Sequence, residues 1–231
     1  MVRLRAALIG EGRMGREIRA IADRHDIEIV HSLGADAMSE GAESRLAEVD
    51  VAFEFTRPEA AVANIESCVA AGCPVVVGSS GWYDRIDEVR ARVEQKGGAL
   101  LWSENFSPGY ALMRAVTGRL AALGAGLEGY DLHIVETHHT EKRDAPSGTA
   151  DRLRLVAERA SGQEVAVTSI RSGHVPGVHE LLIDGPFDRV ELRHDVRDRS
   201  VFADGALRAA RWLVGRTGFF SIDDWVGEVG R

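Results

Sequence analysis

The beginning of the chain combines a buried strand, a glycine-rich turn and a helix. Residues 4–9 are an apolar run, Gly-Glu-Gly-Arg-Met-Gly follows at residues 10–15, and a helical pattern covers residues 16–24. A glycine turn that joins a buried strand to a helix is typical of a βαβ unit, in which a crossover helix connects two parallel strands. This feature constrains the chain to an α/β fold with a parallel sheet.

The same alternation continues through the first half of the sequence. Further strands are predicted at residues 27–30, 49–55, 74–77 and 99–102, and helices at residues 58–71 and 82–95. A tail helix at residues 202–213 is expected to pack back onto this half. We therefore predict a Rossmann-like, dinucleotide-binding domain formed by residues 1–106 and 203–231.

The second half contains more strands than helices. Strands are predicted at residues 131–137, 164–172, 179–184 and 189–195, and one helix at residues 149–160. This pattern indicates an α+β domain with an open mixed or antiparallel sheet. Residues 107–202 are assigned to this domain, with a hinge near residues 105–110.

Composition restricts the possible functions. Of 231 residues, 45% are hydrophobic and 28% are charged, as in ordinary globular proteins. The formal net charge of −8 argues against nucleic-acid and membrane partners, because it offers no general attraction to phosphates. Two cysteines, Cys68 and Cys73, are too few for a disulfide framework and favour the cytoplasm. No targeting or membrane-spanning segment is expected.

The glycine turn has the spacing of a dinucleotide-binding fingerprint. Glycines at these positions permit a tight turn, close approach of a pyrophosphate and close packing of the helix. The simpler alternative is an ordinary turn between a strand and a helix. We favour a cofactor site because the motif lies in the required strand–turn–helix context. The candidate residues are Gly10, Glu11, Gly12, Arg13, Met14 and Gly15.

Two further loops follow predicted strands. They are Gly78-Ser79-Ser80-Gly81 and Ser103-Glu104-Asn105-Phe106-Ser107. Ligands of open α/β sheets lie at the carboxyl ends of the strands, so both loops are expected to border the nicotinamide end of a cofactor. Ordinary turn chemistry is the alternative, since glycine, serine and asparagine favour turns for backbone reasons.

The second predicted strand is not followed by the acid that binds a ribose hydroxyl in many such folds. The sequence there is His31-Ser32-Leu33-Gly34, with Asp36 slightly beyond. Without a carboxylate, a 2′-phosphate meets less repulsion, and His31 or Ser32 can donate a hydrogen bond to it. NADPH is therefore allowed, and NADH is not excluded.

A dense polar segment, Glu-Thr-His-His-Thr-Glu-Lys at residues 136–142, precedes a predicted helix. His138, His139 and Lys142 can exchange protons, although a surface or structural role is more common for any one histidine. The polar run indicates that the strand ends near Glu136 and that a loop begins. We assign a catalytic or substrate-binding role to this segment.

The following helix begins after Asp-Ala-Pro-Ser at residues 144–147. Ser147 has the position and side chain of an N-cap. The backbone N–H groups of Gly148 and Thr149, with the Thr149 hydroxyl, can hold a carboxylate at the positive end of the helix dipole. Capping alone is the simpler interpretation, and the two are compatible.

Potential metal ligands also lie in this region: His133, Glu136, His138, His139 and Glu141. Their spacing matches no HExxH or paired CxxC pattern, and alternation along a strand separates His133 from His138. No metal site is therefore predicted. Cationic side chains at residues 171–179 and 193–199 are mostly interpreted as surface or structural, but together they can make this domain locally positive.

The chain resembles the 4-hydroxy-tetrahydrodipicolinate reductases (dihydrodipicolinate reductases) of the diaminopimelate route to lysine. The most specific likeness is Glu-Thr-His-His-x-x-Lys-x-Asp-Ala-Pro-Ser-Gly-Thr-Ala at residues 136–150. Shorter likenesses cover nearly the whole chain: Gly-Arg-Met-Gly at 12–15, Phe-Thr-x-Pro at 55–58, Asn-Phe-Ser at 105–107, Val-Pro-Gly-x-His at 175–179 and Arg-x-x-Phe-Ala-x-Gly-Ala at 199–206.

The resemblance implies that NADH or NADPH reduces the conjugated imine formed when the substrate, a small cyclic dicarboxylate, loses water. It implies that His138 is the general acid, that Lys142 assists as proton donor and carboxylate contact, and that His139, Gly148 and Thr149 hold the substrate. The cofactor would lie on residues 10–15, 78–80 and 103–106. Homotetramers would form through the sheets of the second domain.

The likeness is weaker in the cofactor half. The glycine turn is one residue shorter than the usual Gly-x-x-Gly-Arg-Met-Gly, Ser79 and Ser80 stand where the family has threonines, and Glu54 stands where aspartate is common. Two other functions therefore compete: a cofactor-sensing regulatory protein on the same fold, and a related reductase of another dicarboxylate. The intact donor segment favours a reductase.

Overall fold

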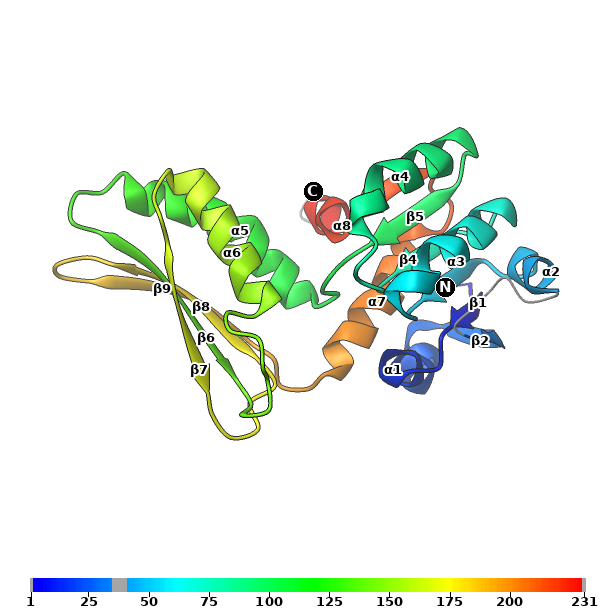
Figure 1. Cartoon of the computed structure of the whole chain (residues 1–231), viewed down its shortest axis with the longest axis horizontal. Coiled ribbons are helices and arrows are strands. Elements are labelled where there is room, and N and C mark those ends of the chain that lie inside the picture. The colour runs from blue at the N-terminus through cyan, green and yellow to red at the C-terminus, as the bar shows by residue number, and fades with distance from the viewer. Residues whose placement is uncertain (1, 35–40, 230–231) are drawn as a thin grey trace. The chain divides into compact units, whose positions relative to one another are not determined.

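A computed structural model describes residues 2–34 and 41–229 (Figure 1). The chain divides into two compact units, one formed by Met1–Ser107 with Ser200–Arg231 and the other by Pro108–Arg199. The chain therefore passes from the first unit to the second after residue 107 and returns to the first unit at residue 200. No described helix is long and apolar enough to cross a membrane.

The first unit is built on a six-stranded sheet. In spatial order the strands are β10 (Gly218–Ser221), β5 (Ala99–Trp102), β4 (Val75–Val77), β3 (Val51–Glu54), β1 (Leu4–Ile9) and β2 (Ile27–Leu33). Every neighbouring pair is parallel. The predicted Rossmann-like architecture is confirmed.

Helices cover both faces of this sheet (Figure 1). They are α1 (Arg13–Ile21), α2 (Ala42–Ala47), α3 (Pro58–Ala70), α4 (Ile86–Gln95), α7 (Ser200–Leu213) and α8 (Ile222–Val229), with 3-10 turns at Ala22–His25 and Tyr83–Arg85. One core packs α2, α3 and α4 against strand residues such as Ile9 and Val75. On the other face α7 contacts β3, β4 and β5, with α1 beside it. Burial on both faces explains why the strands are nearly continuous apolar runs.

The second unit has a four-stranded mixed sheet. Its order is β7 (Ala166–Arg171), β6 (Asp131–His138), β8 (Val178–Asp184) and β9 (Arg189–Asp195). β6 pairs with β7 in parallel, and the other two pairs are antiparallel. Helices α5 (Pro108–Ala125) and α6 (Gly148–Ser161) lie side by side on one face (Figure 1). They bury Ile134, Leu153 and Leu181 in a shared core.

Helix α5 was not among the predicted elements. Glycines at positions 109, 118 and 124 lower its intrinsic helix propensity. Two of them face close neighbours: a Cβ at Gly118 would lie 3.5 Å from Val156 of α6, and one at Gly124 would lie 2.7 Å from Ile183 of β8. Tertiary packing therefore favours the glycines that local propensity disfavours.

Two strands are longer than predicted. β6 does not end at Glu136 but continues to His138, which pairs with Arg171 of β7. β2 continues beyond residue 30 through Ser32 to Leu33. Polar side chains are compatible with both extensions because the ladder is formed by backbone groups. Helices α2 and α8 and the edge strand β10 also had no predicted counterpart.

Leu101 of β5 provides a test of the core, because its side chain is fully buried. Leu101→Ala is expected to lower the free energy of unfolding by about 2–5 kcal/mol, since apolar burial is lost and a cavity remains. Urea denaturation followed by circular dichroism measures the change. Val2→Ala is the control, because Val2 is 83% exposed. Equal effects of the two variants would contradict this description of the core.

Candidate functional site

The three predicted cofactor loops meet at one edge of the first sheet. Residues 10–15 follow β1, residues 78–80 follow β4 and residues 103–106 follow β5. Because these strands are parallel, their carboxyl ends share an edge, which is where open α/β sheets bind ligands.

The glycine turn is tight where it packs and open where a ligand would approach. Gly10 has φ +96°, and a Cβ there would lie 2.3 Å from the carbonyl oxygen of Phe55. A Cβ at Gly15 would lie 2.2 Å from the carbonyl oxygen of Gly10, whereas one at Gly12 would meet no described atom within 4 Å. Gly12 is the N-cap of α1, and as a glycine it has no side chain to accept the first N–H groups of the helix. The shortened turn therefore still fits a pyrophosphate on the N–H groups of the helix.

Phe55 lies beneath the other two loops and was not predicted as a site residue. A Cβ at Gly78 would lie 2.0 Å from the Phe55 ring, and Phe106 packs on that ring at 5.7 Å between centroids. Thr56 donates its backbone N–H to the Ser79 hydroxyl at 2.7 Å. Their position in the sequence could have identified them as site residues, because Phe55 and Thr56 directly follow β3 at the same sheet edge.

The remaining loop residues form an internally bonded turn. Ser103 donates its hydroxyl to the carbonyl oxygen of Asn105 at 2.7 Å, and the Asn105 N–H donates back at 3.1 Å. Phe106 is buried and Glu104 is exposed. The turn is therefore held by hydrogen bonds within the loop itself.

A pocket of about 310 Å³ lies beside the glycine turn and is lined by Leu8, Glu11, Gly15, Arg16 and Arg19. The Arg19 guanidinium donates to the Ser32 hydroxyl near the end of β2 and lies 3.4 Å from the Glu11 carboxylate. His31 pairs instead with Glu48. Asp36 lies outside the described residues. The pocket thus brings two arginines and one carboxylate together beside the glycine turn, near the end of β2.

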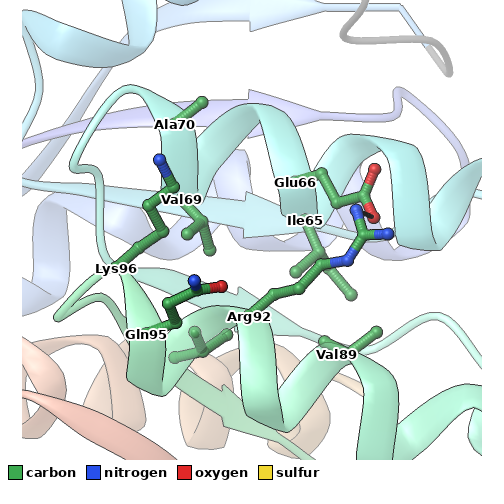
Figure 2. Close-up of a pocket in the computed structure, with 9 residues that line it drawn as sticks. Ile65, Glu66, Val69, Ala70, Val89, Arg92, Gln95 and Lys96 are labelled. Atoms are coloured by element: carbon green, nitrogen blue, oxygen red, sulfur yellow. Dashed lines mark hydrogen bonds and ion pairs between the residues drawn. The ribbon is translucent and has the colours of Figure 1, made fainter.

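A second hollow, of about 270 Å³, lies between α3 and α4 (Figure 2). Its lining includes Val69 and Ala70 at the end of α3 and Gln95 and Lys96 at the end of α4. Helices in βαβ units run antiparallel to their strands, so these helix ends lie towards the edge opposite the cofactor loops. None of the predicted site residues lines this hollow.

In the second unit, strand alternation gathers the polar site residues on the helix-covered face. Ile134, Glu136 and His138 of β6 are buried on this face, with the helices. His133 projects from the opposite face and hydrogen-bonds to Thr168, so its predicted separation from His138 is confirmed. Register then places Ser169 of β7 and His179 of β8 on either side of Glu136.

Glu136 is fully buried and is the centre of this group. Its Oε1 accepts hydrogen bonds from the Ser147 backbone N–H at 3.0 Å, the Ser169 hydroxyl at 2.7 Å and Arg171 Nη2 at 2.8 Å. Burial alone would raise the pKa of this carboxyl, but the hydrogen bonds from Ser147, Arg171 and Ser169 lower it to about 2. Glu136 is therefore an ionised carboxylate inside the second unit.

Two imidazoles lie against that carboxylate. His138 Nε2 is 3.3 Å from Glu136 Oε2 and 3.4 Å from His179 Nε2, and His138 Nδ1 is 3.2 Å from the carbonyl oxygen of Pro176. Burial lowers the pKa of His138, while Glu136 opposes this effect. Burial and the neighbouring His138 lower the pKa of His179 to about 4, so His179 is neutral near neutral pH.

The sequence did not reveal three of these partners. Glu136 was considered only as a potential metal ligand, and Arg171 and His179 were interpreted as surface or structural residues. Arg171 is the last residue of β7 rather than part of a loop, and its guanidinium points to Glu136. The Val-Pro-Gly-x-His likeness at residues 175–179 was the only signal for His179, since strand register cannot be read from spacing.

The other predicted donor and anion-binding residues lie around this group. Lys142 Nζ bonds Asp144 at 2.8 Å, and the Lys142 backbone N–H donates to the carbonyl oxygen of His139 at 3.2 Å. Gly148 and Thr149 are the first residues of α6, after the N-cap Ser147, which accepts the Ala150 N–H at 3.2 Å. The predicted capping is confirmed. The roles of these residues towards a substrate stay predictions.

Glu136, His138 and His179 also form the one group in the described part of the chain whose ligand-type atoms all lie within 4.8 Å of one another. Two of them come from β6 and one from β8, so no local spacing could indicate the group. The Arg171 guanidinium already neutralises Glu136, and both ring nitrogens of His138 have polar neighbours. We therefore do not assign these residues as metal ligands, and the absence of a metal site stays a prediction.

Together, the two units define a class of two-domain oxidoreductases in which one unit has a nucleotide-binding fold and the other carries a buried carboxylate beside two imidazoles. Among solved structures, the fold is similar to that of dipicolinate-bound dihydrodipicolinate reductase from Paenisporosarcina sp. TG-14. The TM-score is 0.83, the identity is 19%, and the match covers 96% of this chain and 98% of that chain.

The chain belongs to the dihydrodipicolinate reductase family. The model of the family's N-terminus matches residues 4–106, and that of its C-terminus matches residues 109–226. The chain is 34% identical to 4-hydroxy-tetrahydrodipicolinate reductase of Christiangramia forsetii, over 96% of this chain and 98% of the relative. It is 32% identical to the Thiobacillus denitrificans enzyme of the same name, over 97% and 98%. The predicted family, enzyme class and nicotinamide cofactor are confirmed.

The glycine turn yields a paired test. Gly10→Ala is expected to lower the free energy of unfolding by about 1–3 kcal/mol from backbone strain at positive φ. The clash of its Cβ with Phe55 adds to this loss. Gly12→Ala is expected to cost about 1 kcal/mol or less, because Gly12 has φ −68° and open space around it. Chemical denaturation of both variants measures the difference. A larger loss for Gly12→Ala would contradict this turn geometry.

Proposed function

We propose that this chain reduces 4-hydroxy-tetrahydrodipicolinate to tetrahydrodipicolinate with NADH or NADPH, in the diaminopimelate route to lysine. The observation that carries the proposal is the match to both halves of the family over nearly the whole chain, with the donor segment intact. A coenzyme bound on the first unit supplies the hydride. Residues of the chain orient the substrate and donate the proton to it.

In this proposal residues 10–15, 78–80 and 103–106 hold the coenzyme through backbone N–H groups and short polar side chains. His139 and the first N–H groups of α6, at Gly148 and Thr149, bind the substrate's carboxylates. His138 protonates the carbon next to the one that receives the hydride. Lys142 assists as a second proton donor and as a carboxylate contact. These residues make residues 107–202 the substrate-binding domain and residues 1–106 with 203–231 the coenzyme domain.

A cofactor-sensing regulatory protein is disfavoured by the chemistry of the second unit. Binding a nucleotide requires neither a buried imidazole beside an ionised carboxylate nor a lysine in the adjoining loop. A reductase of another dicarboxylate would keep the same donors. Steady-state assays with the precursor generated in situ, run with NADH and NADPH in parallel, separate the three functions.

We also propose a cytoplasmic homotetramer. Helices α5 and α6 cover only one face of the second sheet, and the other face carries Val135, Leu182 and the exposed Ile170. Association of such faces would bury these apolar side chains. Both cysteines are free and buried, which is consistent with a reducing compartment.

The role of His138 has a direct test. His138→Gln is expected to lower turnover by about 10²–10⁴-fold, because it removes the proposed general acid and keeps a side chain of similar size. Binding of NADH, measured by fluorescence titration, should persist because the coenzyme loops lie in the other unit. Unchanged turnover would contradict the assignment of His138.

The pocket beside the glycine turn suggests how both coenzymes are accepted. Glu11 suits the ribose hydroxyls of NADH, whereas Arg19 and Ser32 suit the 2′-phosphate of NADPH. Arg19 and Glu11 pair with each other. NADH would therefore bind Glu11 and displace Arg19, whereas NADPH would bind Arg19 and displace Glu11. We therefore propose dual coenzyme use.

Arg19→Ala should shift this balance. Loss of a charge-assisted hydrogen bond to the 2′-phosphate is expected to lower kcat/KM for NADPH about tenfold, while the value for NADH changes little. Arg208→Ala is the matched control, because Arg208 is an exposed arginine of α7 that pairs with Asp204. Equal losses with both coenzymes in Arg19→Ala would contradict a role at the 2′-position.

A further inference from the structure

The two oxygens of Glu136 have different environments. Oε1 accepts hydrogen bonds from Ser147, Ser169 and Arg171. Oε2 is buried and has no hydrogen bond in the described structure, yet it lies 3.3 Å from His138 Nε2. A buried carboxylate oxygen left without a donor is costly, so a proton on Nε2, the nearest ring nitrogen, would stabilise Oε2.

The environment of His138 Nδ1 also favours a protonated ring. Nδ1 lies 3.2 Å from the carbonyl oxygen of Pro176, and a carbonyl oxygen only accepts hydrogen bonds. An imidazolium suits both neighbours, because Nδ1–H donates to Pro176 and the positively charged ring places Nε2–H 3.3 Å from Glu136 Oε2. A neutral ring with a bare Nε2 would instead place its lone pair 3.3 Å from an ionised carboxylate, with His179 Nε2 at 3.4 Å as its hydrogen-bond partner.

The two nitrogens also differ in access. Nε2 is enclosed by Glu136 and His179, which are 0% and 4% exposed. Nδ1 faces the loop at residues 172–177, where Gly177 packs against the ring: a Cβ there would lie 2.9 Å from His138 Cε1. A substrate can compete with a single long hydrogen bond to Pro176, whereas it cannot reach Nε2 without displacing buried groups.

We propose that Glu136 is the positioning residue of His138: its Oε2 holds Nε2–H, so that Nδ1 is the atom from which the proton leaves. The inference rests on the proposed function and names the atom that acts in it. In the step, the Nδ1–H bond breaks, a C–H bond forms on the substrate carbon, and the ring remains as the neutral Nε2–H tautomer bonded to Glu136. The arrangement is analogous to a carboxylate–histidine pair in which the carboxylate fixes the tautomer.

The charges around His138 fit this role. The titratable groups that face it are Glu136 on β6, Arg171 on β7, His179 on β8 and Lys142 in the following loop. Glu136 is the group among them that favours the imidazolium. His179 is neutral near neutral pH, so it packs against the donor without adding a second positive charge.

The wild-type protein provides the first test. Two-bond ¹H–¹⁵N NMR spectra, with the His138 signals assigned by comparison with His138→Gln, report which nitrogen carries the proton in the neutral ring. We expect the Nε2–H tautomer above the titration midpoint of His138. A neutral ring in the Nδ1–H form would overturn the proposal.

Glu136→Gln provides the second test. The variant is expected to lose about 10–100-fold in kcat/KM near neutral pH, because removal of the anion disfavours the acid form of His138. A general acid loses activity as pH rises through its pKa, so the alkaline limb of the pH profile should move to lower pH, and the neutral tautomer should become Nδ1–H. Glu128→Gln, an exposed glutamate in the turn between α5 and β6, is the matched control and should change neither.

Other outcomes separate the possible failures. An equal loss at every pH with an unchanged tautomer would mean that Glu136 is only structural, and would overturn the proposal. If Glu136→Gln does not fold, because Arg171 is left without its partner, the wild-type tautomer still decides. If the wild-type protein has no reductase activity, the proposed function fails, while the tautomer measurement still tests the Glu136–His138 pair.

Discussion

The burial of an ionised carboxylate at Glu136 is the constraint on which the second unit depends. Such a charge is tolerated in a protein interior only when it is paired and hydrogen-bonded. Its three partners come from two elements: Ser147 is the N-cap of α6, and Ser169 and Arg171 lie on β7. The carboxylate therefore links the parallel β6–β7 pair to the first turn of α6, which places the proposed anion-binding N–H groups in the same unit as the proposed proton donors.

The sequence predicted the elements whose signals are local. The strand–glycine–helix pattern indicated the Rossmann-like unit because each part lies within a short window, and Ser147 was identified as a cap from its place before a helix. Helix α5 was missed because its glycines, which serve contacts with Val156 and Ile183, lower local propensity. The elements that the sequence did not predict are those whose formation depends on tertiary packing.

The same limit explains the site. His138 and Lys142 were proposed because they lie close together in sequence with a helix start beyond them. Glu136, Arg171 and His179 were missed because they meet only through the register of three strands, in which Glu136 pairs with His179 on one side and Ser169 on the other. Because the polar run was interpreted as a loop that begins near Glu136, the alternation that puts Glu136 and His138 on one face was not used to pair them.

The two units also tolerate sequence change differently. The coenzyme edge depends mainly on backbone: Gly10 and Gly15 pack against carbonyl oxygens, Gly12 leaves space, and the Ser79 hydroxyl accepts the Thr56 N–H. A shorter turn, or serine in place of threonine, keeps these groups, which explains why this half departs from the family pattern and still matches its N-terminal model. The proton-donor side depends on specific side chains around one buried charge. Removing any partner there leaves a buried polar group unpaired, so this is where the family pattern is retained.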